Sequence, residues 1–296
     1  MFKPLQFVIV LTVLLPSVIF ARYQPAQADP MVTETVQLTA PDANPQARFG
    51  LSVAISGDTA VIGAPAATNN AIPTGEVYLF TYDGSDWLES DKLLPSAVGD
   101  TYFGFSVAVD DDTIAVGAPY SSSGTNNSGA VYVFAADGGG WSEVVRFATG
   151  GGGPVLSDLF GWAVALNGDL LLVGAPLDDI AYVYNRDAAG WQETAVLSGD
   201  DTQFGDRFGF ALATDGERIL AGAPQDDNTG NNAGAAFLFL PDGSGDWQQE
   251  AKLLPTGARF GWSVALDGAT AVSRFIACGP RPATRFRCSH APGGMA

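Results

Sequence analysis

The sequence predicts an all-β protein built from β-propeller blades, because one pattern of about 50 residues recurs along the chain. Phe-Gly begins a copy at Phe49, Phe103, Phe160, Phe208 and Phe260, so successive copies are 48 to 57 residues apart. In the first four copies Gly-Ala-Pro begins 14 positions after the Phe of Phe-Gly. A fixed offset inside a repeat indicates a structural constraint, and this period is typical of propellers, solenoids or arrays.

The first strand of each copy follows Phe-Gly. Bulky residues stand at the second, fourth and sixth positions after Phe, as in Phe105, Val107 and Val109, and small residues stand between them. This alternation predicts a strand with one bulky face and one thin face. Both faces are apolar or small, so we expect neighbouring sheets to cover the strand on both sides, as stacked blades require.

The rest of each copy supplies three more strands. A polar turn such as Gly57-Asp58 leads to a β-branched run that ends at Gly-Ala-Pro, because Pro stops the ladder. A variable loop, a third apolar strand, an Asp-Gly turn and a strand headed by Trp complete the unit. Four short antiparallel strands fit one propeller blade. The segment Glu34 to Leu38 matches the fourth strand, and we expect it to pair in a blade at the N-terminal edge.

Together these motifs resemble the FG-GAP repeat family, whose members include the integrin α-subunit propeller and many secreted bacterial proteins. The resemblance covers roughly residues 33 to 272. It implies four complete blades and a fifth that starts at Phe260 and is broken. Integrin-type rings hold seven blades and need roughly 350 residues at this period. We therefore expect an incomplete or open ring, a smaller ring or a fragment.

The N-terminal residues 1 to 28 have the features of a secretory signal peptide. An apolar run from Phe7 to Phe20 follows Lys3, and Ala26-Gln27-Ala28 is a small-residue cleavage site. The alternative is an uncleaved anchor, but the run is shorter than the ~20 residues of a spanning helix. We expect a secreted or cell-surface protein with no membrane insertion after cleavage, and a propeller body from residue 29 to residue 272.

The segment from residue 273 to residue 296 differs in composition from the body. It contains Cys278, Cys288, His290 and four Arg, and no acidic residue. Where the register requires Gly-Ala-Pro, residues 274 to 276 are Arg, Phe and Ile. Three interpretations remain for this aberrant basic tail: a frameshifted end, a genuine tail with a disulfide between Cys278 and Cys288, or a redox or metal site. We expect it not to be a packed part of the propeller.

Charge and composition limit the chemistry of the body. It holds eight basic and 32 acidic residues, and so large a negative charge disfavours nucleic acid and anionic lipid as partners. It contains neither His nor Cys, which removes Ser-His-Asp and Cys-His catalysis and the usual zinc ligands. We expect no enzyme, no cofactor and no metal site. A secreted hydrolase would need convergent carboxylates instead.

Calcium is a separate case, since integrin-type blades often carry a D-x-D-x-D-G-x-x-D loop between the first two strands. Here that connection is as short as Gly57-Asp58, too short to surround an ion that takes six to eight oxygens. We therefore expect no tight calcium site in these turns. Weak calcium binding remains possible at Asp226, Asp227 and Asn228 with the nearby Asn231 and Asn232; the alternative is a solvated polar loop.

In a four-stranded meander the 2-to-3 and 4-to-1 connections share one end of the blades. We call this end the long-loop face, and its variable loops are residues 66–74, 120–128, 149–159, 198–207 and 225–233. Recognition residues occur disproportionately on loops held by a rigid scaffold. We expect a secreted or cell-surface adhesion module that binds an extracellular protein or glycan here; the alternatives are a hydrolase and a truncated product without function. The candidate ligand contacts are Asn126, Asn127, Asp178, Asp179, Asp226, Asp227 and Asn228. Asn126 also begins a glycosylation sequon.

Overall fold

The computed structural model describes residues 36–40, 42, 46–68, 74–97, 101–122, 128–148, 158–254, 260–268, 270–274 and 285–287. The chain divides into two compact units, Met1–Gln37 and Leu38–Ala296, and the second contains every strand named below. No helix within these ranges is long and apolar enough to cross a membrane. The expected signal peptide lies outside the described residues.

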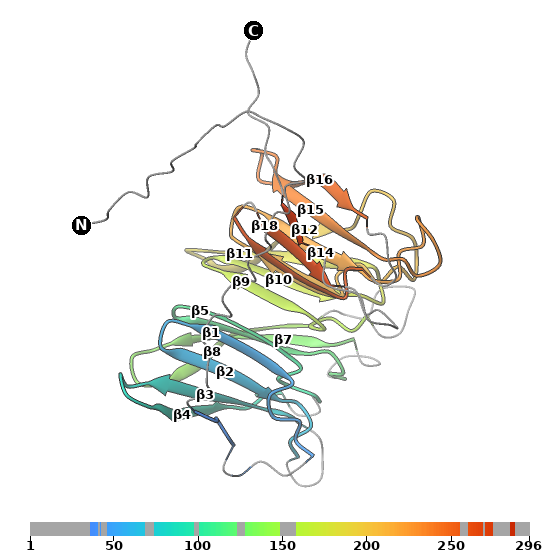
Figure 1. Cartoon of the computed structure of the whole chain (residues 1–296). Coiled ribbons are helices and arrows are strands. Elements are labelled where there is room, and N and C mark those ends of the chain that lie inside the picture. Colours follow the sequence, from blue (N-terminus) through green and yellow to red (C-terminus); the bar gives the residue numbers. More distant parts are fainter. Residues whose placement is uncertain are drawn as a thin grey trace, which may run out of the picture. The chain divides into compact units, whose positions relative to one another are not determined.

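The described part of the chain is all-β: four four-stranded sheets and one three-stranded sheet, none closed on itself, follow one another in sequence (Figure 1). Each is an antiparallel meander in sequence order, which confirms four complete propeller blades and an incomplete fifth in an open arrangement. Blade 1 contains β1 (Ser52–Ser56), β2 (Thr59–Ala64), β3 (Glu76–Tyr82) and β4 (Trp87–Leu93). Blade 2 contains β5 (Ser106–Asp110), β6 (Thr113–Ala118), β7 (Ala130–Ala136) and β8 (Trp141–Ala148). Blade 3 contains β9 (Val164–Asn167), β10 (Leu170–Ala175), β11 (Ile180–Asp187) and β12 (Gly190–Leu197). Blade 4 contains β13 (Ala211–Thr214), β14 (Ile219–Ala223), β15 (Ala235–Pro241) and β16 (Trp247–Leu253). Blade 5 contains β17 (Ser263–Asp267), β18 (Thr270–Arg274) and β19 (Arg285–Arg287).

Two glycines fix how one blade meets the next. The Gly of each Gly-Ala-Pro lies against the Phe-Gly backbone of the following blade: a Cβ added to Gly63 would stand 2.0 Å from the carbonyl oxygen of Gly104. A Cβ on Gly117 would stand 2.1 Å from the carbonyl oxygen of Gly161, and the same overlap recurs at the next two interfaces. Only a hydrogen atom fits in this space, so the position requires glycine.

The constant offset between the two motifs has its origin in the same contact. Within a blade, the N–H of Gly104 donates to the carbonyl oxygen of Gly117 (3.1 Å), and Gly161 donates likewise to Gly174 (3.1 Å). The glycine of Phe-Gly therefore makes two contacts. Its N–H bonds to the Gly-Ala-Pro glycine of its own blade, and its backbone lies against the Gly-Ala-Pro glycine of the preceding blade. An insertion in the turn between the first two strands would break one of these contacts, because the strands that join them have a fixed length.

The apolar core lies between neighbouring blades. Val61 and Leu79 of blade 1 pack in one cluster with Val107, Ile114 and Tyr132 of blade 2, and similar clusters join the later blades. Fully buried Phe side chains of the repeat motif anchor these interfaces: Phe103, Phe160, Phe208 and Phe260. Each buried Phe contributes about 1.5–3 kcal/mol, so the repeat motif supplies much of the attraction between blades.

The outer strand of every complete blade has a bulge at the same place. The pairing between the third and fourth strands shifts by one residue, which leaves one extra residue on the outer strand: Ser90, Val144, Thr194 and Glu250. A bulge increases the local twist and makes the edge of a sheet a poorer template for another strand.

The N-terminal segment differs from the expectation. Glu34 and Thr35 lie outside the described residues, and residues 36–38 form no strand. Leu38 and Ala40 instead pack on the face of blade 1 turned away from blade 2. The expected strand pairing is therefore wrong for the described part of this segment, whose apolar side chains cover a blade without joining a ladder.

The fifth blade continues beyond the boundary expected at residue 272. Ser273 lies in β18 with 2% of its surface exposed, and its hydroxyl accepts the N–H of Gly261 (3.0 Å). β19 pairs with β18 as a third strand. The expectation of an unpacked tail is thus wrong for Ser273 and β19, because β18 keeps its pairing with β17 past that point. Cys278, Cys288 and His290 lie outside the described residues, so the three interpretations of the tail stay open.

Candidate functional site

The structure brings the 2-to-3 connection of one blade beside the Phe-Gly motif of the next on the long-loop face. Isolated bridges join Gly75 to Phe103, Gly129 to Phe160 and Gly234 to Phe260. The opposite end of the blades has tight turns, since only two residues separate the paired ends of β1 and β2, of β5 and β6 and of β9 and β10. The long connections therefore gather on one face, whereas short turns of neighbouring blades meet on the other, where the N–H of Gly168 donates to the carboxylate of Asp110 (2.5 Å).

One backbone position on this face has an uncommon conformation. The residue before Phe-Gly has φ between 56° and 65° in Arg48, Tyr102, Leu159 and Arg207. Side chains other than Gly rarely adopt this region. The buried Phe-Gly contact fixes the backbone that follows, so this position can hold different side chains without changing the scaffold.

Arg48 and Tyr102, two of these residues, line a pocket together with Thr101, Phe105 and Tyr120. The pocket encloses about 450 Å³, within the range of small-molecule sites. The ring centroids of Tyr102 and Tyr120 are 5.0 Å apart, and those of Phe105 and Tyr120 are 6.1 Å apart. The hydroxyl of Thr101 donates to the carbonyl oxygen of Tyr120 (2.8 Å), which holds the loop against the pocket. The result is an aromatic pocket with one guanidinium in its wall.

Phe105 also begins a continuous row of aromatic rings. The centroid distances are 4.7 Å from Phe105 to Trp162, 5.2 Å from Trp162 to Phe210 and 4.7 Å from Phe210 to Trp262. We call these four side chains the aromatic row; each stands two positions after the Phe of Phe-Gly, in blades 2 to 5. Neighbouring rings are tilted by 46–47°, and all four remain partly open to solvent, Trp262 with 37% exposed. The pocket thus continues into a row that crosses four blades.

Lys252 organises the acidic loop of blade 4. Its Nζ donates to the carboxylates of Asp226 (2.7 Å) and Asp201 (2.8 Å) and lies 5.0 Å from the ring centroid of Phe237. Asp226 is fully buried. Burial lowers the pKa of Lys252, but the hydrogen bonds to Asp201 and Asp226 outweigh it and raise that pKa above its ordinary value. This cluster is an internal ion pair that ties β16 to the loop.

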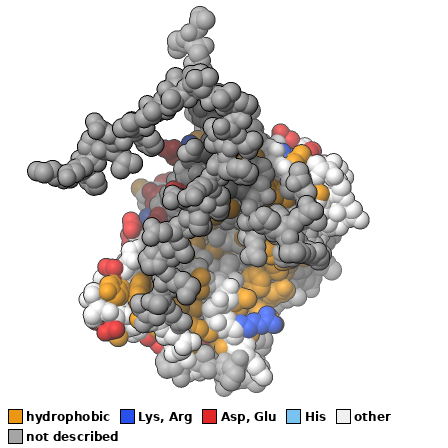
Figure 2. Space-filling view, viewed as in Figure 1, with side chains coloured by type: hydrophobic (Ala, Val, Ile, Leu, Met, Phe, Trp, Pro, Cys, Tyr) orange, Lys and Arg blue, Asp and Glu red, His pale blue; other side chains and the backbone are white. Residues whose placement is uncertain are grey.

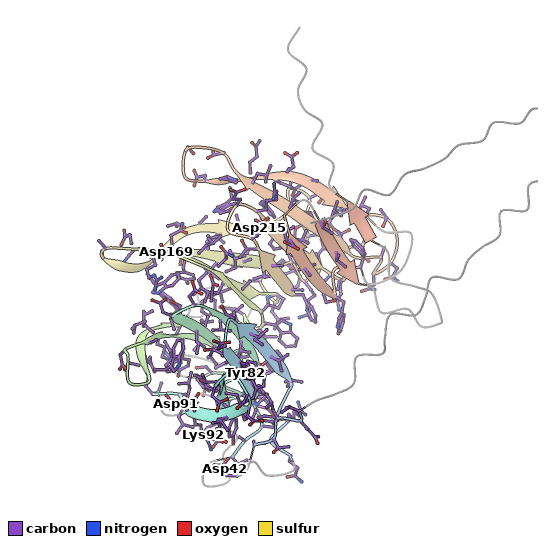
Figure 3. The ribbon with its side chains drawn as sticks, turned by 60° about the vertical axis from the view of Figure 1, so that its left-hand side comes forward. Asp42, Tyr82, Asp91, Lys92, Asp169 and Asp215 are labelled. Carbon is purple, nitrogen blue, oxygen red and sulfur yellow. The ribbon has the colours of Figure 1, made fainter. Side chains whose placement is uncertain are left out.

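The same position carries a cation in two other blades. Lys92 of blade 1 lies over the ring of Tyr78 (4.5 Å) and pairs with Asp42 and Glu76. Figure 3 shows Asp42 and Lys92 on neighbouring segments. Arg146 of blade 2 lies over Tyr132. In blade 3 the residue paired with the equivalent Tyr182 is Val196, so this blade has no cation there.

Asp179 of blade 3 replaces the glycine that precedes the third strand in the other complete blades, and it has φ 58°. Its carboxylate accepts the N–H groups of Gly205 (2.7 Å), Arg207 and Phe208 (3.2 Å). Burial raises the pKa of Asp179, although these three hydrogen bonds act in the opposite direction. In the other complete blades this glycine forms a backbone bridge to the Phe of the next Phe-Gly. In blade 3 the hydrogen bonds of the Asp179 side chain take the place of that bridge.

Asp178 precedes this residue and faces another carboxyl group. Burial raises the pKa of Asp178 to about 6; the charge of Asp158, a hydrogen bond with Asp158 and the charge of Asp179 add to the effect. Asp158 is itself 2% exposed. Blade 3 thus places two carboxyl groups together where blades 1, 2 and 4 hold Lys or Arg, and Asp178 takes up a proton as the pH falls below about 6.

The structure changes the assignment of the candidate contacts. Asn126 and Asn127 lie outside the described residues. Asp179 and Asp226 are buried and their carboxylates are bonded within the protein, so both now belong to the scaffold. Exposed positions remain at Asp227 and Asn228, whereas Asp178 is half-buried beside Asp158. The aromatic pocket and row were not among the candidates, although an aromatic residue recurs two positions after the Phe of Phe-Gly in four of the five copies.

The blade 4 loop does not fit calcium. Its one fully buried carboxylate, Asp226, is already neutralised by the ammonium group of Lys252 at 2.7 Å. Calcium needs several oxygens converging on one point. Across the described ranges, His, Cys, Asp and Glu side chains form no group of three or more that could hold a metal ion.

Four segments of the chain match a family model described as FG-GAP repeat: residues 32–80, 87–134, 141–189 and 191–239. The segments cover four successive repeats. A comparison with curated proteins gives no match.

Solved structures share the fold at low sequence identity. A functionally unknown protein from Desulfotomaculum acetoxidans is similar with a TM-score of 0.54 and 11% identity over 77% of this chain. A protein from Lactobacillus plantarum is similar with a TM-score of 0.51 and 17% identity over 80% of this chain and 70% of its own. The match spans 62% of the length of the first of these proteins.

Proposed function

Since this chain belongs to the FG-GAP repeat family, we propose that it is an exported, non-enzymatic interaction module that binds an extracellular protein or glycan through its long-loop face. The observation that carries this proposal is the aromatic pocket formed by Arg48, Thr101, Tyr102, Phe105 and Tyr120. Concave aromatic surfaces with a few polar groups are the usual form of a binding site. The scaffold around the pocket is rigid, because buried interfaces between blades hold it.

Composition supports the non-enzymatic part of the proposal. The body from residue 29 to residue 272 contains neither His nor Cys, so it offers no imidazole base and no thiolate nucleophile. Its acidic residues cluster in turns and loops, where Asp and Asn bond to the local backbone, as Asp83 and Asp242 do. The apolar N-terminal run and its small-residue cleavage site support export.

The proposal is tested by changing the long-loop face while keeping the scaffold. One variant replaces residues 122–127 and 227–233 with Gly-Ser linkers of equal length, which leaves the buried Asp226 in place. A second variant carries Tyr102→Ala and Tyr120→Ala. The matched control replaces residues 84–85, the tip of the turn between β3 and β4 at the opposite end of the blades.

Attachment of the purified protein to cells or extracellular matrix is then measured, together with the melting temperature. We expect the first two variants to lose attachment at an unchanged melting temperature and the control to keep it. Attachment that survives in both variants, or turnover of a glycoside or ester substrate by the protein, would refute the proposal.

A further inference from the structure

We propose that the long-loop face binds a linear polysaccharide that carries uronic acid groups. The aromatic row holds consecutive sugar rings, and Arg48 pairs with a carboxylate at the pocket end of the row. This inference rests on the proposed function, because it assigns a ligand class to that same face.

The shape of the site matches a polymer. Sugar rings have apolar C–H faces and polar hydroxyl edges, so they lie on exposed aromatic faces while their hydroxyls bond to nearby polar groups. Rings of the aromatic row are tilted by 46–47° to each other, so none is covered by flat stacking on its neighbour. Their centroids are 4.7–5.2 Å apart. Each blade from the second to the fifth supplies one ring, and a repeating surface of this kind suits a ligand with repeating units.

The pocket end of the row supplies the polar groups. Tyr102 and Tyr120 bring phenolic hydroxyls, which donate and accept hydrogen bonds, beside the ring of Phe105. Tyr102 and Tyr120 are half-buried and thus held in place. A rigid amphipathic ring of this type gives contact area at a low cost in conformational entropy.

Arg48 gives the site its preference for a carboxylate. Among the described residues, Lys92, Arg186, Arg218 and Lys252 form ion pairs with Asp or Glu, whereas Arg48 is exposed and forms none with any described residue. A guanidinium binds a carboxylate through two parallel hydrogen bonds. Figure 2 shows small groups of acidic side chains along the left edge and at the upper right, and fewer basic ones. With a net charge of −18, the protein repels a densely charged polyanion, so spaced carboxylates on sugars fit better than nucleic acid.

Binding is measured by isothermal titration of the purified protein with xylo-oligosaccharides that carry a single glucuronate side group and with neutral xylo-oligosaccharides of the same length. Trp162→Leu removes a ring from the middle of the aromatic row and keeps an apolar side chain. Arg48→Gln removes the positive charge and keeps a polar group. Tyr82→Leu is the control for the ring, since Tyr82 is a half-buried aromatic residue at the end of β3, beside the turn at the opposite end of the blades. Arg218→Gln at the opposite end of the blades is the control for charge.

We expect the protein to bind the glucuronate-bearing oligosaccharides more tightly than the neutral ones. Trp162→Leu should weaken both by about tenfold, as loss of a central aromatic contact does. Arg48→Gln should weaken only the uronate ligand and remove the salt dependence of its binding. Both control variants should bind as the parent does. Melting temperatures and the change in tryptophan fluorescence on ligand addition separate a binding defect from misfolding.

Two outcomes would overturn the inference. The first is that neither oligosaccharide binds, and the second is that the Trp162→Leu and Arg48→Gln variants bind both ligands as the parent does. If attachment to cells or matrix still depends on the long-loop face in that case, and protease treatment of the matrix abolishes it, the ligand is a protein and the proposed function stands without the sugar. If attachment does not depend on this face, the proposed function fails as well.

Discussion

Replacing Asp178 with Asn should stabilise the protein at neutral pH and remove the loss of stability that Asp178 causes as the pH rises to about 6. Burial raises the pKa of Asp178 from an ordinary 3.8 to about 6, with the charge of Asp158 as the next cause. The folded state therefore binds a proton more tightly than the unfolded state at this site. Stability supplied by the protonated form is fully present below the unfolded pKa and falls as pH rises to about 6, after which it stays constant.

The size of the effect follows from the same numbers. The difference between the ordinary pKa of 3.8 and the folded-state pKa of about 6 corresponds to about 3 kcal/mol of unfolding free energy for a site closed to solvent. Asp178 is only half-buried, and solvent screens its charge, so we expect about 1–2 kcal/mol of relief at pH 8. Asn keeps the shape and can donate a hydrogen bond to the Asp158 carboxylate. Tyr182, whose pKa burial raises to about 12, stays neutral throughout.

The assay is thermal unfolding of the parent and the Asp178→Asn variant between pH 4 and pH 8. A gain of 1–2 kcal/mol raises the melting temperature of a body of this size by about 2–8 °C. We expect this gain at pH 8 and little difference near pH 4. Asp267→Asn is the matched control, because it removes the same charge from an exposed position. An equal shift at both pH values, a shift matched by Asp267→Asn, or a loss of stability at pH 8 would show that the carboxyl pair does not hold a proton.

Three further predictions test the scaffold. Gly117→Ala should cost about 3 kcal/mol or more, because the new Cβ would stand 2.1 Å from a carbonyl oxygen of blade 3. Gly139→Ala should change the midpoint of urea denaturation little, because the new Cβ would stand 3.8 Å from its nearest neighbour, the carboxylate of Asp137. Lys252→Met should cost about 3–5 kcal/mol of unfolding free energy, measured by urea denaturation, because it leaves the carboxylate of Asp226 buried and unpaired. Combining this change with Asp226→Asn should recover most of the loss. Calorimetric titration of the purified body with calcium should show no micromolar site in the two-residue turns, and several such sites would contradict the geometric argument.

The sequence allowed the blades to be predicted because their determinants are local and repeated. Phe-Gly and Gly-Ala-Pro are separated by one short hairpin, so their spacing in the sequence reports their pairing directly. The strand expected over residues 34–38 is wrong for the described residues 36–38, since a match to a strand pattern does not supply a partner strand. The boundary at residue 272 was wrong because composition changes there before the pairing of β18 ends.

The site could not be predicted in the same way. Neighbours in the aromatic row, such as Phe105 and Trp162, come from different repeats, and their contact depends on how blades stack. Acidic residues in polar loops look alike in a sequence, yet Asp226 is fully buried while the adjacent Asp227 is exposed. The direction of each side chain was decided by partners far along the chain, here Lys252, and not by its immediate neighbours.

The glycine contact between blades also bears on how such a protein can lengthen. Gly104 touches the preceding blade through its backbone, and Gly117 touches the following blade through the space left by a missing side chain. Every repeat thus carries both halves of the junction, and neither half depends on which repeat stands beside it. Duplication of one whole repeat in the gene would leave the new copy with a correct junction on each side, while its loops and the side chain before Phe-Gly remain free to diverge.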